Sequence, residues 1–219
     1  MPKATFFNLP DDKRARIVEL AIDEFAAHPF RQASLSRIVA RAGIAKGSMY
    51  QYFENKLDLF RWLIFDHVGQ KKLAYLADAE PPEGLFDQLE SMVVAGTRFL
   101  LDNPALGRLA QSIVEPSSDP QLRALSRDIL AQGHAYMRAR VEAAQARGEV
   151  RDDLDAELIA HVLRVVIGQG VIDVLLARLG VDLFGLLEDP QIARRISEAQ
   201  LRALIRDVLA FVRGGIAAA

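Results

Sequence analysis

Apolar residues recur at helical spacing along most of the chain, and no segment shows the strict alternation of a half-buried strand. The apolar periods end at helix breakers such as Pro29, Gly43 and the pair Pro81 and Pro82. The chain is therefore predicted to be all-α. About nine helices are expected, over residues 11–28, 34–42, 45–53, 56–78, 85–102, 104–115, 120–147, 155–179 and 190–213.

Two short helices around a tight turn are predicted between Ser34 and Phe53, and a third helix before them completes a three-helix module. Ser34 is positioned to cap the first of the pair, because its hydroxyl can accept an unpaired backbone N–H. Gly43 follows at once, where a helix needs a residue that tolerates positive φ in order to end. The side chains expected to point inward are Leu35, Ile38, Val39, Ala42, Met49 and Phe53.

The outward face of the second short helix carries a cation, hydroxyls, an amide and phenols, a set that suits the major groove of DNA. Between Arg31 and Phe53 the chain has four basic residues and no Asp or Glu, although the whole chain has 27 Lys+Arg against 29 Asp+Glu. DNA binding requires a basic patch rather than a basic chain. A DNA-binding helix-turn-helix is therefore favoured over a solvated polar hairpin.

The segment from Gly43 to Phe60, GIAKGSMYQYFENKLDLF, resembles the signature of TetR-family transcriptional regulators. That signature has a glycine, then Gly-(Ser/Thr), then Tyr-x-(His/Tyr)-Phe and a lysine at a fixed distance. The segment from Arg16 to Phe25 is similar to the family's first helix. The resemblance covers about residues 10–60, and beyond them only helical layout and length agree.

The resemblance implies an operator-DNA interface made of residues from both helices of the motif and from the start of the next helix. Gln51 is added for its chemistry, because an amide can read adenine, although it can equally face solvent. The complete set is Ser36, Arg37, Lys46, Gly47, Ser48, Tyr50, Gln51, Tyr52 and Lys56.

One long helix is predicted from Lys56 to about Asp78, and no linker separates it from the DNA-binding module. A displacement at its far end can therefore be transmitted to the module. The chain is divided accordingly into a helix-turn-helix DNA-binding domain, residues 1–55, and a larger helical effector-binding and dimerisation domain, residues 56–219.

The last two predicted helices are apolar on more than one face and must be buried on more than one side. A second copy of the chain is the natural partner, giving a four-helix bundle with two-fold symmetry. The alternative is an internal core in a monomer. A homodimer is favoured, because paired helix-turn-helix modules bind half-sites about one helical turn apart or multiples of it.

The family resemblance also places a small-molecule cavity among the central helices, for which a largely apolar effector is expected. Each candidate residue has an ordinary alternative, because aromatic stripes are often plain core and a mid-helix arginine often extends to the surface. The candidates are Trp62, Phe65, Met92, Phe99, Gln111, His134, Met137 and Arg164.

The sequence lacks the residues that several other classes of protein need. Cysteine is absent, and the four histidines are scattered without metal-ligand spacing or a catalytic motif. We therefore expect no metal, no cofactor and no enzymatic activity. The N-terminus does not resemble a signal peptide, and the most apolar stretch, residues 161–179, carries three charged residues. No membrane partner and a cytoplasmic location are expected.

The sequence thus predicts a one-component, ligand-responsive transcriptional regulator. By resemblance it is a repressor that binds a palindromic operator as a dimer and is released by its effector. Two alternatives stay open: a helical small-molecule-binding protein, and a structural DNA-binding protein without an effector switch.

Overall fold

The computed structural model describes residues 1–45, 47–75, 82–114 and 119–217. These residues are helical without a strand, apart from one isolated bridge between Val150 and Ala217. The predicted all-α class is therefore confirmed. The chain divides into two compact units, one of Met1–Leu73 with Asn103–Arg127 and one of Ala74–Asp102 with Asp128–Ala219.

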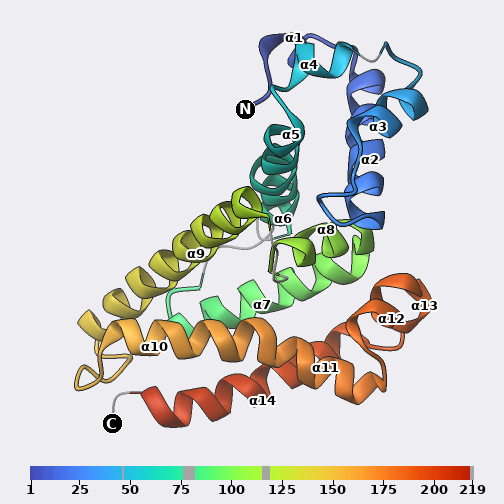
Figure 1. The fold of residues 1–219 in the computed structure, drawn as a ribbon. Helices are drawn as coiled ribbons and strands as arrows, with labels where there is room; N and C mark the ends of the chain where they lie inside the picture. Colours follow the sequence, from blue (N-terminus) through green and yellow to red (C-terminus); the bar gives the residue numbers. More distant parts are fainter. Residues whose placement is uncertain (46, 76–81, 115–118, 218–219) are drawn as a thin grey trace. The chain divides into compact units, whose positions relative to one another are not determined.

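The first unit contains the short N-terminal helices, the long helix that follows them, and α8 (Figure 1). Its elements are α1 (Ala4–Phe7), α2 (Asp11–Ala27), α3 (Leu35–Ala42), α4 (Ser48–Tyr52), α5 (Lys56–Trp62), the π-helix η1 (Leu63–Val68), most of α6 (Gly69–Ala74), α8 (Pro104–Val114) and the start of α9 (Pro120–Ala146). Helix α2 packs against both α3 and α8. Helix α3 therefore rests on α2, while α4 packs against α1 and α3.

Helices α5, η1 and α6 follow one another without a break, so the predicted long helix is confirmed through residue 74. Residues 76–78 of that prediction lie outside the described part of the chain. The middle of the helix is π-helical, with i→i+5 bonding that puts residues five apart on one side. Trp62 and His67 accordingly lie side by side, with ring centroids 5.9 Å apart.

The second unit is a separate helical core in which α14 packs along α7 and α11. Its elements are α7 (Leu85–Asp102), the rest of α9, α10 (Ala156–Leu163), the π-helix η2 (Arg164–Gly170), α11 (Val171–Leu179), α12 (Leu183–Glu188), α13 (Pro190–Ala193) and α14 (Glu198–Ile216). Its buried side chains include Leu85, Leu89, Val141, Leu163, Leu175, Leu201, Leu204 and Ile205.

Two short helices, α1 and α12, were not expected from the periodicity, and the last predicted helix is divided into two. The expected helix over residues 190–213 is interrupted after α13 and restarts at Glu198. The reason is a capping box, in which the Ser197 hydroxyl accepts the Gln200 N–H while the Gln200 side chain accepts the Ser197 N–H.

One helix of the described residues, Ala156–Leu179, is long and apolar enough to cross a membrane by length and composition alone. Only 33% of its most apolar window is buried within the chain. A helix at a protein–protein interface has the same properties, so composition by itself is weak evidence for a membrane span.

Candidate nucleic-acid interface

The turn between α3 and α4 depends on Gly43, as the sequence predicts. Gly43 has a left-handed backbone, with φ 65° and ψ 28°, a conformation that strains any residue with a Cβ. Its N–H donates to the Ala40 carbonyl at 3.3 Å, and the N–H of Ile44 donates to the Val39 carbonyl at 3.1 Å. These bonds satisfy carbonyls that the end of a helix leaves unpaired.

The inward face of the motif largely matches its prediction. The buried side chains are Ile38, Val39, Met49 and Phe53, while Leu35 and Ala42 are half-buried. Ser34, however, makes no side-chain cap, so the predicted hydroxyl cap is wrong. Its own backbone N–H donates to Glu24 Oε1 at 2.7 Å, so a carboxylate on α2 holds the residue that precedes α3.

Helix α1 holds the end of α4 through backbone carbonyls. The Lys3 N–H donates to the Tyr52 carbonyl at 2.8 Å, and Lys3 Nζ donates to the Tyr50 carbonyl at 2.8 Å. The Thr5 hydroxyl donates to the carbonyl of Gln51. A helix of five residues leaves its last carbonyls unpaired, so these donors compensate for the shortness of α4.

The outward face of the motif presents most of the predicted DNA-binding side chains. Gly47, Tyr50 and Gln51 are exposed on and before α4, Ser48 is half-buried beside them, and Ser36 is exposed on α3. Tyr50 has 54% of its surface exposed. These five residues are accessible to a ligand, and their DNA contacts stay predictions. Lys46, the sixth residue of this face, lies outside the described residues.

Tyr52 is packed against α1 and is not accessible as the other outward residues are, which corrects the expectation that it faces DNA. It is only 6% exposed, and its ring centroid is 6.0 Å from that of Phe6 on α1. Its position three residues after the buried Met49 puts it beside the buried face of the helix.

Arg37 is held by an acid rather than left free for DNA. Its Nη2 and Nε atoms lie 2.5 Å and 3.0 Å from Glu24 Oε1, and Nη2 also donates to the Gln32 carbonyl at 2.7 Å. Burial of Glu24 would raise the pKa of its carboxyl, but the bonds from Arg37 and from the Ser34 N–H outweigh burial and lower it. Glu24 is therefore a charged anchor for the start of α3.

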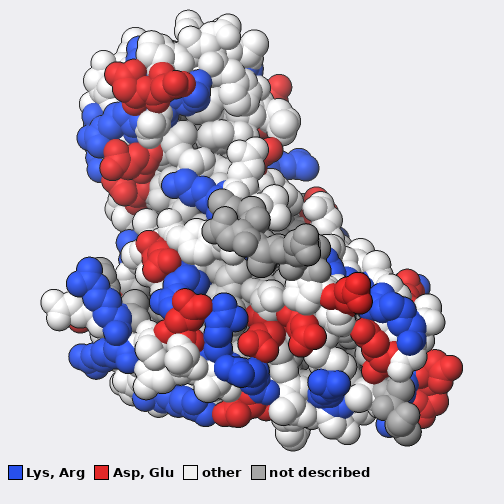
Figure 2. Space-filling view, turned by 180° about the vertical axis from the view of Figure 1, so that it is seen from behind, with Lys and Arg blue, Asp and Glu red and all other residues white. Residues whose placement is uncertain are grey.

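The basic patch expected from the sequence is partly neutralised by α2. Asp23 pairs with Arg41 on α3 at 2.9 Å, next to the pair formed by Glu24 and Arg37. Figure 2 shows acidic and basic side chains interleaved on one face of the first unit. The positive charge available to phosphates is therefore smaller than a count along residues 31–53 suggests.

Lys56, for which the sequence predicts a phosphate contact, donates to backbone carbonyls of the protein itself. Its Nζ donates to the carbonyls of Phe30, Arg31 and Ala33, at 2.6, 3.2 and 2.9 Å. The same atom lies 4.7 Å from the centroid of the Phe30 ring. An ammonium group has three donors, so these carbonyls use all of them. Burial lowers the pKa of Lys56.

The eight candidate effector residues do not gather at one described site. Trp62, Phe65 and Gln111 belong to the first unit, where the side chain of Gln111 lies outside what the structure describes. Met92, Phe99, His134, Met137 and Arg164 belong to the second unit. Of the eight, Trp62 alone lines the cavity of about 850 Å³ that the described residues of the first unit form.

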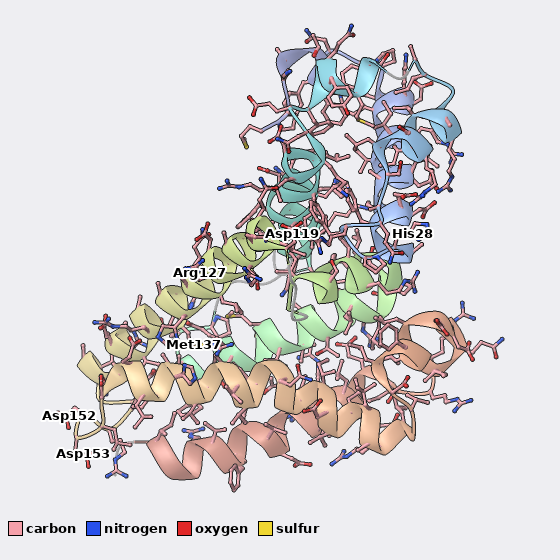
Figure 3. The ribbon with its side chains drawn as sticks, in the orientation of Figure 1. His28, Asp119, Arg127, Met137, Asp152 and Asp153 are labelled. Carbon is pink, nitrogen blue, oxygen red and sulfur yellow. The ribbon has the colours of Figure 1, made fainter. Side chains whose placement is uncertain are left out.

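Four of the five candidates of the second unit lie in its core or contact another of its residues. Met137, on α9 (Figure 3), is buried in the core, as is Phe99. His134 Nε2 is 2.8 Å from Glu157 Oε1, and the Tyr136 hydroxyl is 4.0 Å from the Met92 sulfur.

Comparison with known proteins identifies both parts of the chain. Residues 17–63 match the family described as "Bacterial regulatory proteins, tetR family". Residues 83–182 match the family described as "Tetracyclin repressor-like, C-terminal domain".

Similar proteins align with most or all of the chain. A TetR family transcriptional regulator from Chloroflexus aurantiacus J-10-FL has 32% identity over 100% of both chains, with a TM-score of 0.74. The "Probable acrEF/envCD operon repressor" of Escherichia coli K12 is 26% identical over 180 residues, which is 78% of this chain and 80% of that protein. FadR of Bacillus subtilis, solved with stearoyl-CoA, shares the fold at 21% identity, covering 92% of this chain and 98% of FadR, with a TM-score of 0.67.

Proposed function

Because this chain belongs to the TetR family of transcriptional regulators, we propose that it is a one-component repressor that binds a palindromic operator as a homodimer and is released by a small-molecule effector. The observation that carries the DNA-binding part is the accessible face of α4, where Tyr50 and Gln51 project from a backbone that α1 holds in place. Phenol and amide groups on a helix of this kind suit phosphate contact and base readout.

The homodimer is supported by apolar side chains that the single chain leaves in contact with water. They lie on the two long C-terminal helices, where most of the apolar window of 156–179 is exposed. The exposed residues are Leu158, Val162, Val165, Val174 and Phe211. An apolar surface of this kind marks an interaction site, and an isologous dimer through the last two long helices covers it in both copies.

The effector switch requires a ligand with different affinities for the DNA-binding and released states. We assign DNA binding to residues 1–55 and effector binding and dimerisation to residues 56–219, with the continuous helix 56–74 as the connection. A coupling of ~1–3 kcal/mol changes operator affinity about 5–150-fold. By reciprocity, operator DNA weakens effector binding by the same factor. Equal effector affinities with and without operator would exclude this switch.

The same proposal assigns the protein to the cytoplasm and gives it no catalytic role. The relatives are named as bacterial regulatory proteins and as an operon repressor. A protein that binds operator DNA in a bacterial cell acts in the cytoplasm and needs no catalytic site. The apolar helix 156–179 then belongs to the dimer rather than to a membrane.

Selection of operators from a random DNA library, followed by binding to the best sequence, tests the function. A palindromic consensus bound by two chains supports the proposal. The two alternatives predict different results: a structural DNA-binding protein gives no consensus, and a small-molecule-binding protein selects no DNA. Replacing Tyr50 or Lys46 by alanine must weaken operator binding without changing the thermal melting temperature.

A further inference from the structure

The first unit contains a cavity of about 850 Å³ between α2, the helix 56–74 and the start of α8. Small-molecule sites commonly have volumes of about 300–1,000 Å³. We propose that this cavity binds a small amphipathic organic anion, with its apolar body between α2 and α8 and its anionic oxygens at His67 and Lys71. This site is separate from the candidate effector residues of the second unit, and its existence does not depend on the repressor function.

The apolar part of the cavity wall comes from all three helices. Val18 and Ile22 contribute from α2, Trp62 from α5, and Ala105 and Leu106 from α8. Contact between α2 and α8 places these side chains around one space. A ligand with an aromatic or aliphatic body can therefore leave water there and gain the free energy of apolar burial.

The three carboxylates of the wall already have arginine partners. Asp11 pairs with Arg14, which lines the cavity too. Glu19 pairs with Arg16 and Asp23 with Arg41, each at 2.9 Å, and these two arginines do not line the cavity. The three acids of the wall are matched by Arg14, Lys71 and Arg108, so the wall alone has no net charge. Counting Arg16 and Arg41, which pair with two of the acids from outside, makes the surroundings positive. That balance favours an anion over a cation.

Lys71 supplies a charged donor for the anionic group, and His67 supplies a second one in the tautomer that carries the proton on Nε2. The side-chain Nε2 of His67 is buried and has no hydrogen-bond partner among the described residues. Lys71, four residues further on the same helix, lines the cavity, and its charge adds to burial in lowering the pKa of His67. Leaving a buried polar atom without a partner is unfavourable, and a bound oxygen atom that pairs with it can recover that free energy. The ammonium of Lys71 can reach the same oxygens.

The π-helical turn explains how the donors and the apolar wall come together. It puts His67 on the side of Trp62, with ring centroids 5.9 Å apart, so that both line one cavity. Trp62 also contacts Phe6 and Phe53, with ring centroids 5.1 and 5.7 Å away. Functional sites are frequent at such turns.

Trp62 is the only tryptophan of the chain, so its fluorescence reports on this cavity directly. The probes are 1-anilinonaphthalene-8-sulfonate and its uncharged counterpart N-phenyl-1-naphthylamine, titrated into the intact protein without DNA. We expect the sulfonate to quench Trp62 by energy transfer and to bind more tightly than the uncharged probe. Absence of sulfonate binding, or equal affinity for both probes, would overturn the proposal.

Cavity-filling variants establish where the probe binds. Ala15→Phe and Ala105→Phe place a ring in the cavity from two different helices, and each should weaken sulfonate binding about tenfold or more. Ala15 is exposed, so its variant retains the packing of the core. Ala27→Phe is the matched control, since Ala27 is exposed on the same helix and does not line the cavity. Wild-type affinity in both cavity variants would show that the probe binds elsewhere.

Charge variants establish the ligand class. Lys71→Gln should weaken sulfonate binding about threefold, as expected for a partly solvated ion pair, and leave binding of the uncharged probe unchanged. Lys13→Gln, on the exposed part of α2 outside the cavity, should affect neither probe. An unchanged preference for the sulfonate in Lys71→Gln would refute the assigned anion position.

Discussion

Arg37 on α3 and Glu24 on α2 form a bidentate ion pair, in which Nε lies 3.0 and 3.2 Å from the two carboxylate oxygens. Glu24 is 3% exposed, whereas 49% of the Arg37 side chain is exposed. Turning the guanidinium toward a phosphate would leave a buried carboxylate without its partner, which is costly. Arg37 is therefore better described as a positioning residue for α3 than as a DNA contact.

Replacing Glu24 by glutamine should lower the free energy of unfolding by about 1–3 kcal/mol, because Arg37 loses its counterion. The value should lie at the low end, since solvent screens the exposed half of the pair. Urea denaturation followed by circular dichroism measures it. Glu19→Gln, which removes a surface pair on the same helix, is the control and should cost less. Equal effects of the two variants would contradict the anchoring role.

The stability difference between the wild type and Glu24→Gln should also depend on pH. The folded-state pKa of Glu24 is lowered from its ordinary value of 4.5 by Arg37 and the Ser34 N–H, which outweigh burial. A lowered carboxyl pKa stabilises the folded state above the unfolded-state pKa, and this stabilisation is lost as the pH falls toward the folded-state value. The difference should therefore be full at neutral pH and shrink below about pH 4.5. A difference that grows on acidification would contradict this sign.

Replacing Lys56 by methionine should destabilise the protein by about 1–3 kcal/mol, because three carbonyls lose a charged donor. The dependence of operator affinity on salt should stay unchanged. If Lys56 instead contacts a phosphate, the slope of log K against log salt should fall in magnitude by about one. Titrations at several salt concentrations, with Lys13→Met as a surface control, decide between the two roles.

Tyr50 and Tyr52 should respond oppositely to loss of the hydroxyl. Tyr50→Phe should weaken operator binding by about 1 kcal/mol at constant melting temperature, because an exposed phenol loses one hydrogen bond to DNA. Tyr52→Phe should leave operator affinity unchanged, since its ring is packed under α1. Fluorescence anisotropy with the selected operator measures both. Weakening by Tyr52→Phe alone would restore the DNA contact first expected of that residue.

Replacing Val165 by aspartate should convert the protein to a monomer. Val165 is 48% exposed on η2, and a dimer would bury the new carboxylate without a partner. Sedimentation velocity at micromolar concentration gives the oligomeric state. Leu130→Asp, which places the same charge on an exposed part of α9, should stay dimeric. A dimeric Val165→Asp would exclude this face as the interface.

The helices could be predicted because helical spacing and chain breakers are local properties of the sequence. The environment of a charged side chain is not local. Arg37 and Lys56 fall at DNA-contact positions by their place in the motif, yet Glu24 and the Phe30 carbonyl come from elsewhere in the fold. The π-helical turn was not predictable either, because no residue type requires it.

Two features of the sequence do indicate these environments. Glu24 falls on the apolar face of its helix, three residues after Ala21 and next to Phe25. An acid at such a position needs a buried partner. Tyr52 follows Met49 at helical spacing, which already places it with the inward residues.

The support of α4 by α1 has a consequence for how DNA specificity can change. Lys3 and Thr5 bind the carbonyls of Tyr50, Gln51 and Tyr52, groups that every amino acid carries. The outward side chains at 50 and 51 can therefore be exchanged without loss of these bonds. Retargeting to a new operator, by evolution or by design, is thereby separated from the stability of the reading helix.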